Sequence, residues 1–229
     1  MRTLVLSSAI LALVAVGAEA ALSQAEQKRV DNSASVLRDM TNIPPDIWQR
    51  ANCIVVIPSV KKAAFVVGGE YGKGVASCRT PSGWSAPAFF ALEKGSWGLQ
   101  IGGETIDLVL MVMNQTGIEH LLQDKFTLGA GGSLAAGPVG RSAAAETDAQ
   151  MQAEILSYSR SQGLFAGIDL SGGVLKPDTD SNSDGYGSSV APRDILLTHT
   201  VKAPAGTRPF LVALRDVTRS EGQPAGGIK

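Results

Sequence analysis

Residues 53–57 read Cys-Ile-Val-Val-Ile and are followed by Pro58, and residues 63–77 read AAFVVGGEYGKGVAS. β-Branched and aromatic residues favour strands, and prolines and glycines at short intervals interrupt them. The pattern predicts a strand at Ile54–Ile57 that Pro58 ends, and a glycine-interrupted strand or strand pair at Ala63–Ser77. Because glycine within a strand permits bulges, coiling and close backbone approach, we expect a strongly curved or closed sheet.

The same β pattern continues towards the C-terminus and is flanked by helical patterns. Ser23 and Glu26 have the spacing of a capping box, which marks the start of a helix. Further strands are predicted at Trp84–Leu92, Trp97–Met113, Phe126–Ala136, Ile155–Ser159 and Leu164–Leu170, with turns at 93–96 and 160–163. Helices are predicted at Gln24–Met40, Asp46–Ala51, Thr116–Gln123 and Arg208–Thr218. The predicted fold class is α+β, a strongly coiled antiparallel, barrel-like sheet with a few packed helices.

The N-terminus has the pattern of an export signal. Arg2 precedes the apolar run Leu4–Val16, and Ala18-Glu19-Ala20 then forms a small-x-small cleavage site. The run is shorter than the roughly 20 residues that span a bilayer. Residues 1–20 are predicted to be a signal peptide, 21–218 a single domain and 219–229 a flexible tail. We expect the mature protein in the periplasm or outside the cell, either free or peripherally bound to a membrane.

Charge and cysteine content limit the classes of partner and site. Lys plus Arg number 20 and Asp plus Glu 21, so net charge supplies no general attraction to nucleic acid or anionic membrane. We therefore expect no nucleic-acid partner. Export favours a disulfide between Cys53 and Cys78, worth roughly 3 kcal/mol, and the alternative is two buried thiols. With His120 and His199 far apart in the sequence, no metal site is expected.

Eight ordered blocks of sequence resemble the SYLF domain family, which occurs in yeast endocytic-patch proteins, phosphoinositide-binding proteins of animals and plants, and bacterial envelope proteins. The blocks are RANCIVVIP (50–58), FVVGGEYGKGV (65–75), GWSAPAF (83–89), GLQIGG (98–103), DLVLMVMN (107–114), AGPVGR (136–141), YSRSQGLFAG (158–167) and YG (186–187). The resemblance implies a lipid-binding module, with phosphoinositide contact in eukaryotic members and actin association in yeast members. Because a signal peptide would separate this chain from both cytosolic ligands, only lipid binding as a class is expected here.

No pattern of catalytic residues is present in the sequence, so we expect neither an enzyme nor a cofactor. Ser85 lacks a G-x-S-x-G elbow and is interpreted as supporting a turn. Asp180, Asn182 and Asp184 follow the first half of a calcium-binding loop, but its twelfth position is Ala191 rather than Glu. The segment is therefore predicted to be a solvated acidic surface loop, and a weak calcium site is the alternative.

Basic residues beside predicted turns are the candidate contacts for anionic lipid headgroups, because they supply charge-assisted hydrogen bonds at a surface. These candidates are Lys61, Lys62, Lys73, Arg141 and Arg160. For each of them alone, the alternative is a solvated charge or an internal salt-bridge partner. The predicted function is an exported lipid-binding module of the cell envelope, with membrane phospholipid as the partner. The alternative is a structural or protein-interaction module with an envelope protein as its partner and no lipid ligand.

Overall fold

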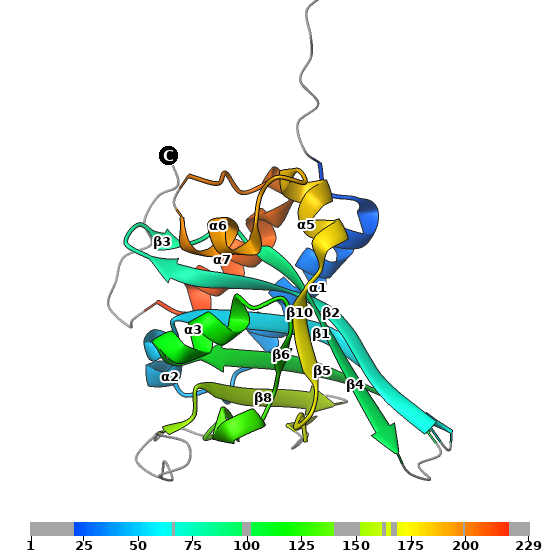
Figure 1. Ribbon diagram of the computed structural model, residues 1–229. Coiled ribbons are helices and arrows are strands. Elements are labelled where there is room, and N and C mark those ends of the chain that lie inside the picture. Colours follow the sequence, from blue (N-terminus) through cyan, green and yellow to red (C-terminus); the bar gives the residue numbers. More distant parts are fainter. Residues whose placement is uncertain are drawn as a thin grey trace, which may run out of the picture.

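The computed structural model describes residues 21–65, 67–97, 102–139, 152–161, 164–165, 169–198 and 200–219. The predicted signal peptide and residues 220–229 of the predicted tail lie outside these ranges, as does Arg141. Among the described residues, the strands form one strongly curled sheet with the order β6–β10–β4–β2–β1–β5–β8–β7 (Figure 1). The short β3 pairs with β2, and β9 pairs with β8.

The strand bounds show that four long strands dominate the sheet. They are β1 (Cys53–Phe65), β2 (Val67–Thr80), β4 (Ala88–Trp97) and β5 (Gly102–Val112). The shorter strands are β3 (Gly83–Trp84), β6 (Phe126–Thr127), β7 (Leu134–Ala136), β8 (Ile155–Ser161), β9 (Leu164–Phe165) and β10 (Val174–Pro177). All the described pairs are antiparallel except β7 with β8. The α+β class with a coiled, barrel-like sheet is confirmed.

Helices cover the two faces of this sheet. Their bounds are α1 (Gln24–Asp39), α2 (Pro45–Arg50), α3 (Gln115–Leu121), α5 (Thr179–Tyr186), α6 (Pro192–Leu197) and α7 (Arg208–Val217), with short 3-10 turns η1 (Ala130–Gly132) and η3 (Ala205–Thr207). The predicted capping box starts α1: Ser23 Oγ accepts a hydrogen bond from the Glu26 backbone N–H, and the Glu26 carboxylate accepts one from the Ser23 N–H at 2.7 Å. The four predicted helices are present within one or two residues of their expected ends.

The central strands are buried on both faces. Ile54 and Val56 lie in one core with α1, α2 and α7, whereas Val55 and Ile57 lie in a second core with α3 and α6. Successive residues of a strand point to opposite faces, so a strand buried on both sides must be apolar at consecutive positions. This burial explains the uninterrupted apolar runs of β1 and β5.

Pro58 does not end the first strand, contrary to prediction. β1 continues through a bulge at 58–59, where the register with both β2 and β5 shifts. A bulge tolerates proline because the extra residue leaves the hydrogen-bond ladder. Ser59 has a positive φ of 53°, and its backbone N–H donates to Asp107 Oδ1 at 2.9 Å. The predicted strand pair at 63–77 is therefore the end of β1 followed by most of β2.

Four other local predictions are wrong. The turn at 93–96 is absent because β4 continues to Trp97 in register with β2. The strand predicted at 126–136 is broken into β6, η1 and β7, and the strand predicted at 164–170 is limited to β9 among the described residues. The acidic segment is not a loop but helix α5, and β10 and α6 were not predicted.

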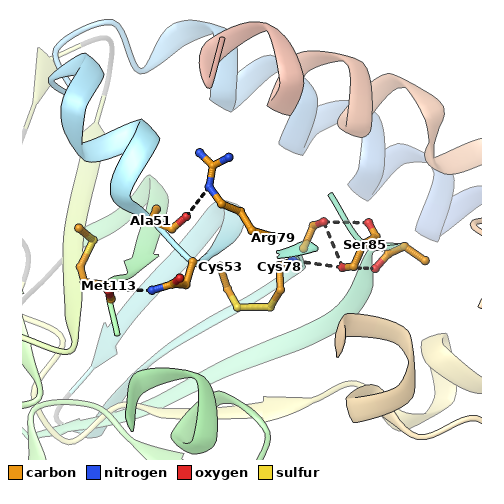
Figure 2. The surroundings of a disulfide bond; sticks show 9 residues. Ala51, Cys53, Cys78, Arg79, Ser85 and Met113 are labelled. Atoms are coloured by element: carbon orange, nitrogen blue, oxygen red, sulfur yellow. Dashed lines mark hydrogen bonds between the residues drawn. A yellow bond between two sulfur atoms is a disulfide. The ribbon is translucent and has the colours of Figure 1, made fainter. Parts of the chain in front are cut away.

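The disulfide joins Cys53 and Cys78, which face each other across β1 and β2 (Figure 2). This pairing confirms the predicted bridge. On one side of it, the Arg79 guanidinium donates hydrogen bonds to the Ala51 and Trp48 carbonyl oxygens, both at 2.9 Å. On the other side, the Ser85 hydroxyl accepts from the Cys78 N–H at 3.1 Å and bonds to Ser77. The bridge thus ties the start of β1 to the last part of β2.

Reduction of this bridge is expected to lower the free energy of unfolding by about 3 kcal/mol, because the unfolded chain regains the freedom of the loop between the cysteines. Urea unfolding of the oxidised protein with and without dithiothreitol measures the change. A Cys53→Ser/Cys78→Ser variant should unfold at the reduced midpoint under both conditions. Equal midpoints for oxidised and reduced wild type would contradict the expectation.

Gly74 permits the close approach of β2 to the bulged part of β1. A Cβ atom at this position would lie 2.0 Å from the Val56 carbonyl oxygen, which is backbone and cannot rotate away. Gly74→Ala is therefore expected to lower the free energy of unfolding by about 3 kcal/mol. Gly95→Ala is the matched control, since a Cβ there meets nothing within 4 Å. Similar urea midpoints for the two variants would show that the strands can separate without cost.

Candidate functional site

A groove of about 270 Å³ lies between helix α1 and the β1–β2 hairpin. The bulge at 58–59 forms part of one wall, and the N-terminal half of α1 forms the other. The lining residues are Ala25, Lys28, Arg29 and Asn32 of α1, Pro58, Ser59 and Lys61 of β1, and Tyr71, Gly72 and Lys73 of β2. The groove therefore joins a helix to strands that lie more than 25 residues further along the chain.

The lining is strongly cationic. It contains Lys28, Arg29, Lys61 and Lys73, and none of the lining residues is an Asp or Glu. Lys28 and Lys61 are exposed to solvent. Basic side chains converging from a helix and two strands form a local positive site in a chain whose net charge is −1. The chemistry of such a site is suited to anionic groups that carry several oxygen acceptors, because lysine and arginine donate charge-assisted hydrogen bonds.

Asp178, between β10 and α5, anchors two of these cations beneath the groove. Its side chain is 8% exposed, and Oδ2 lies 2.9 Å from Arg29 Nη1 and 2.8 Å from Lys73 Nζ. Ser181 Oγ donates to the same oxygen at 2.8 Å. The Arg29 guanidinium also lies 5.3 Å from the centre of the Phe89 ring, within the range of a cation–π contact. Arg29 is thereby fixed within the fold, whereas Lys73 is held at the groove with 37% of its side chain exposed.

The surroundings of Asp178 keep its carboxylate charged. Burial alone would raise the pKa of Asp178, but hydrogen bonds from Lys73, Ser181 and Arg29 outweigh burial and hold that pKa below its ordinary value. A charged Asp178 in turn fixes the positions of Arg29 and Lys73. The site is therefore arranged before any ligand arrives.

Tyr71 adds an apolar surface to this cationic site. It is 45% exposed, pairs in register with Lys61 across the hairpin, and lines the same groove. An aromatic ring beside ammonium groups suits a ligand that has an apolar part next to its charge. The groove thus combines charge recognition with a non-polar wall.

The structure brings together only part of the predicted basic set. Lys61 and Lys73 share the groove, whereas Lys62 points to the other face of β1 and forms an ion pair with Glu70 at 3.5 Å. Arg160 instead binds Asp39 at 3.0 Å, away from the groove. Arg141 lies outside the described residues. Lys62 and Arg160 are therefore placed in ion pairs and not in a common patch with Lys61.

Sequence reasoning missed Lys28, Arg29 and Asp178. Adjacent basic residues within the predicted first helix were a possible signal for Lys28 and Arg29. Nothing in the local sequence places this helix over the β1–β2 hairpin. Asp178 lies 149 residues from Arg29, so only the tertiary fold reveals their contact.

The predicted acidic loop is a structural element of the core. Asn182 is 2% exposed, its Oδ1 accepts from the Phe89 N–H at 2.8 Å, and its amide donates to the Phe89 carbonyl at 2.9 Å. The oxygen that a calcium ion would need is engaged in this pairing with β4. Within the described ranges, no three His, Cys, Asp or Glu side chains gather into a potential metal site.

His120 of α3 makes two side-chain contacts. His120 Nδ1 lies 2.7 Å from Glu154 Oε2, and the His120 ring stacks on Phe126. His120 therefore packs against Glu154 and Phe126 beside α3.

As far as the structure describes the chain, its helices are too short or too polar to cross a bilayer.

Comparison with known proteins identifies the family. The model of the Ysc84 family, described as Las17-binding protein actin regulator, matches residues 93–217, which is more than half of the chain. The chain belongs to the Ysc84 family. This membership confirms the SYLF resemblance found in the sequence motifs. The groove cations Lys28, Arg29, Lys61 and Lys73 precede the matched range, whereas Asp178 lies within it.

Among the Ysc84 relatives, LAS seventeen-binding protein 3 of Saccharomyces cerevisiae (strain ATCC 204508 / S288c) is 33% identical over 176 residues. That alignment covers 75% of this chain and 38% of the yeast protein. SH3 domain-containing YSC84-like protein 1 of Homo sapiens is 31% identical over 180 residues, covering 73% of this chain and 52% of the human protein. The chain thus spans about two fifths to one half of the length of these relatives.

Acid should weaken the fold through Asp178. A carboxyl group whose pKa is lowered by folding stabilises the protein above its unfolded pKa of about 3.9, and this contribution is lost as the pH falls below that value. Asp178→Asn should cost on the order of 2 kcal/mol at pH 7, less than for a fully buried pair because Lys73 reaches solvent. The cost should shrink at about pH 3.

Urea unfolding at both pH values, with exposed Asp184→Asn as the control, measures this difference. A constant cost for Asp178→Asn at the two pH values would mean that its charge is not what stabilises the site.

Proposed function

We propose that this Ysc84-family chain is an exported, non-catalytic module that binds the anionic headgroups of membrane phospholipids in the α1–hairpin groove. The observation that carries the proposal is the convergence of Lys28, Arg29, Lys61 and Lys73 in a lining without carboxylates. The phosphate of a lipid headgroup supplies the oxygen acceptors that such a site requires. A near-neutral net charge makes this local site the source of attraction.

The roles of the cations differ within this proposal. Lys28 and Lys61 are exposed and provide most of the attraction to a headgroup. The Lys73 ammonium carries three N–H donors, and its bond to Asp178 leaves donors for a ligand in the groove. Tyr71 would contact the glycerol or the upper part of an acyl chain. Arg29 chiefly maintains the position of α1 through Asp178.

Export is the part of the proposal that concerns compartment. The N-terminal pattern of residues 1–20 and the Cys53–Cys78 bridge support it, since disulfides persist in oxidising compartments. The ligand would then be a lipid of the periplasmic or external membrane surface.

The second candidate function is a protein-interaction module, and a second groove favours it. This groove of about 540 Å³ lies where α1, α2 and the end of α7 meet, and Leu37, Ile43, Trp48 and Val217 line it together with Arg38 and Arg219. The family description and the yeast relatives' names refer to binding of Las17. A protein partner at this groove would leave the cationic site unused.

Charge removal in the cationic groove tests the lipid proposal. Lys28→Gln/Lys61→Gln should weaken binding to vesicles of phosphatidylcholine with phosphatidylglycerol by roughly tenfold to thirtyfold, because each lysine near an anionic surface contributes about 1 kcal/mol. The matched control is Lys125→Gln/Lys202→Gln, which removes two exposed lysines outside the groove. Co-sedimentation measures binding, and circular dichroism checks the fold.

Added salt should weaken wild-type binding more than binding of the groove variant, since salt screens exposed charges. Equal losses in the groove and control variants would assign the attraction to overall charge. A wild type that binds no vesicle would reject the lipid function and favour the protein-interaction candidate.

A further inference from the structure

The four long strands extend beyond the rest of the sheet. On β4, pairing with β10 reaches only Glu93, and on β5, pairing with β8 starts at Ile106. Beyond these positions β4, β2, β1 and β5 pair with one another alone among the described strands. Figure 1 shows this ribbon running away from the body of the sheet towards the lower right.

A row of alternating charges crosses the ribbon at one level. Lys94 on β4 is in register with Glu70 on β2, Glu70 with Lys62 on β1, and Lys62 with Glu104 on β5. Opposite charges at facing positions stabilise neighbouring strands. The row is the last level of the ribbon that carries any charge among the described residues.

Beyond the charged row, β1, β2 and β4 continue for three more register positions and β5 for two, and none of these positions carries a charged residue. We call this part the ribbon tip, and its residues are Ala63, Ala64, Phe65, Val67, Gly68, Gly69, Gly95, Ser96, Trp97, Gly102 and Gly103. The final register pairs bring Phe65 beside Val67 and Val67 beside Trp97. At about 3.3 Å per residue, the tip extends roughly 10 Å past the charges.

We propose that the ribbon tip enters the interfacial layer of a lipid bilayer and that the charged row stops at the headgroups. This inference rests on the proposed lipid function. An insertion of about 5–10 Å is typical of peripheral membrane contacts, and tryptophan is enriched at this depth. In the tip, β4, β2 and β1 pair to their last described residues and β5 pairs with β1 up to Ala64, so most backbone N–H and C=O groups enter already hydrogen-bonded.

The position of the groove agrees with a molecule whose ribbon tip points into the bilayer. Lys61 and Tyr71, which line the groove, pair one position before the charged row on the same hairpin. They lie four residues from Phe65 and Val67 along their strands, or about 13 Å. A tip placed in the interface would therefore bring the groove to the level of the lipid headgroups.

A second copy of the chain is a less suitable partner for the ribbon tip than a lipid bilayer. A stable interface between protein copies requires roughly 20–30 residues on each side. The described tip has eleven residues, and five of these are glycine. Such a surface is too small for a stable dimer but sufficient to insert two aromatic residues into lipid.

Placing a charge in the tip tests the proposal. Phe65→Glu and Trp97→Glu should each weaken binding of the full chain to vesicles roughly tenfold or more, because the transfer of a large apolar side chain out of water is lost. These two variants should also bind vesicles more weakly than wild type when salt is added. Gln123→Glu is the matched control, as it adds the same charge to an exposed position near the opposite end of β5.

A second measurement reports depth and does not depend on a disruptive variant. Vesicles with bromine on the upper acyl chain should quench the tryptophan fluorescence of the wild type. Trp97→Phe should keep vesicle binding within about twofold but remove this quenching, since Trp48 and Trp84 lie in or against the core beside α1, α2 and α7.

The outcomes separate the two proposals. If the tip variants bind like wild type while Lys28→Gln/Lys61→Gln does not, the tip proposal is overturned and the groove function stands. If quenching persists in Trp97→Phe, the tip is not the inserted part. A lipid-free dimer that Trp97→Glu dissociates would assign the tip to a second copy, and a wild type that binds no vesicle would overturn both proposals.

Discussion

Burial of both faces of the central strands is the constraint on which the rest of the structure depends. Two separate cores, with α1, α2 and α7 on one side and α3 and α6 on the other, require apolar residues at consecutive strand positions. The same constraint fixes α1 across the β1–β2 hairpin, since its apolar stripe must complete one of these cores. The polar side of α1 then lies beside residues of the β1–β2 hairpin, and the cationic groove forms between them.

Ion pairing with Asp178 allows several cations to lie close together at the groove. Removing a charge from water is unfavourable unless a partner compensates it, and Asp178 compensates Arg29 and Lys73 at the same time. Lys28 and Lys61 need no such partner because they stay in solvent. The groove therefore separates charges that hold the fold together from charges that are available to a ligand.

The ribbon lies where the burial of both sheet faces ends. Within the sheet, both faces of β1 and β5 are apolar, but beyond Glu93 and Ile106 no flanking strand continues among the described residues. There the sequence changes to a charged row and then to a tip of small and aromatic residues. The yeast and human relatives are about twice as long as the aligned region or longer, so this chain corresponds to one part of their length.

The sequence by itself determined the α+β class and the capped first helix, because strands and caps depend on nearby residues, and it favoured a bridge between Cys53 and Cys78 over two buried thiols. It also indicated Lys61 and Lys73, which are basic residues in a glycine-rich hairpin. Only the tertiary structure decided that adjacent Lys62 lies on the opposite face, since strand side chains alternate and a bulge resets their register. Likewise, only the fold brought Asp178 to the groove, because contacts across 149 residues follow from topology and leave no trace in local sequence.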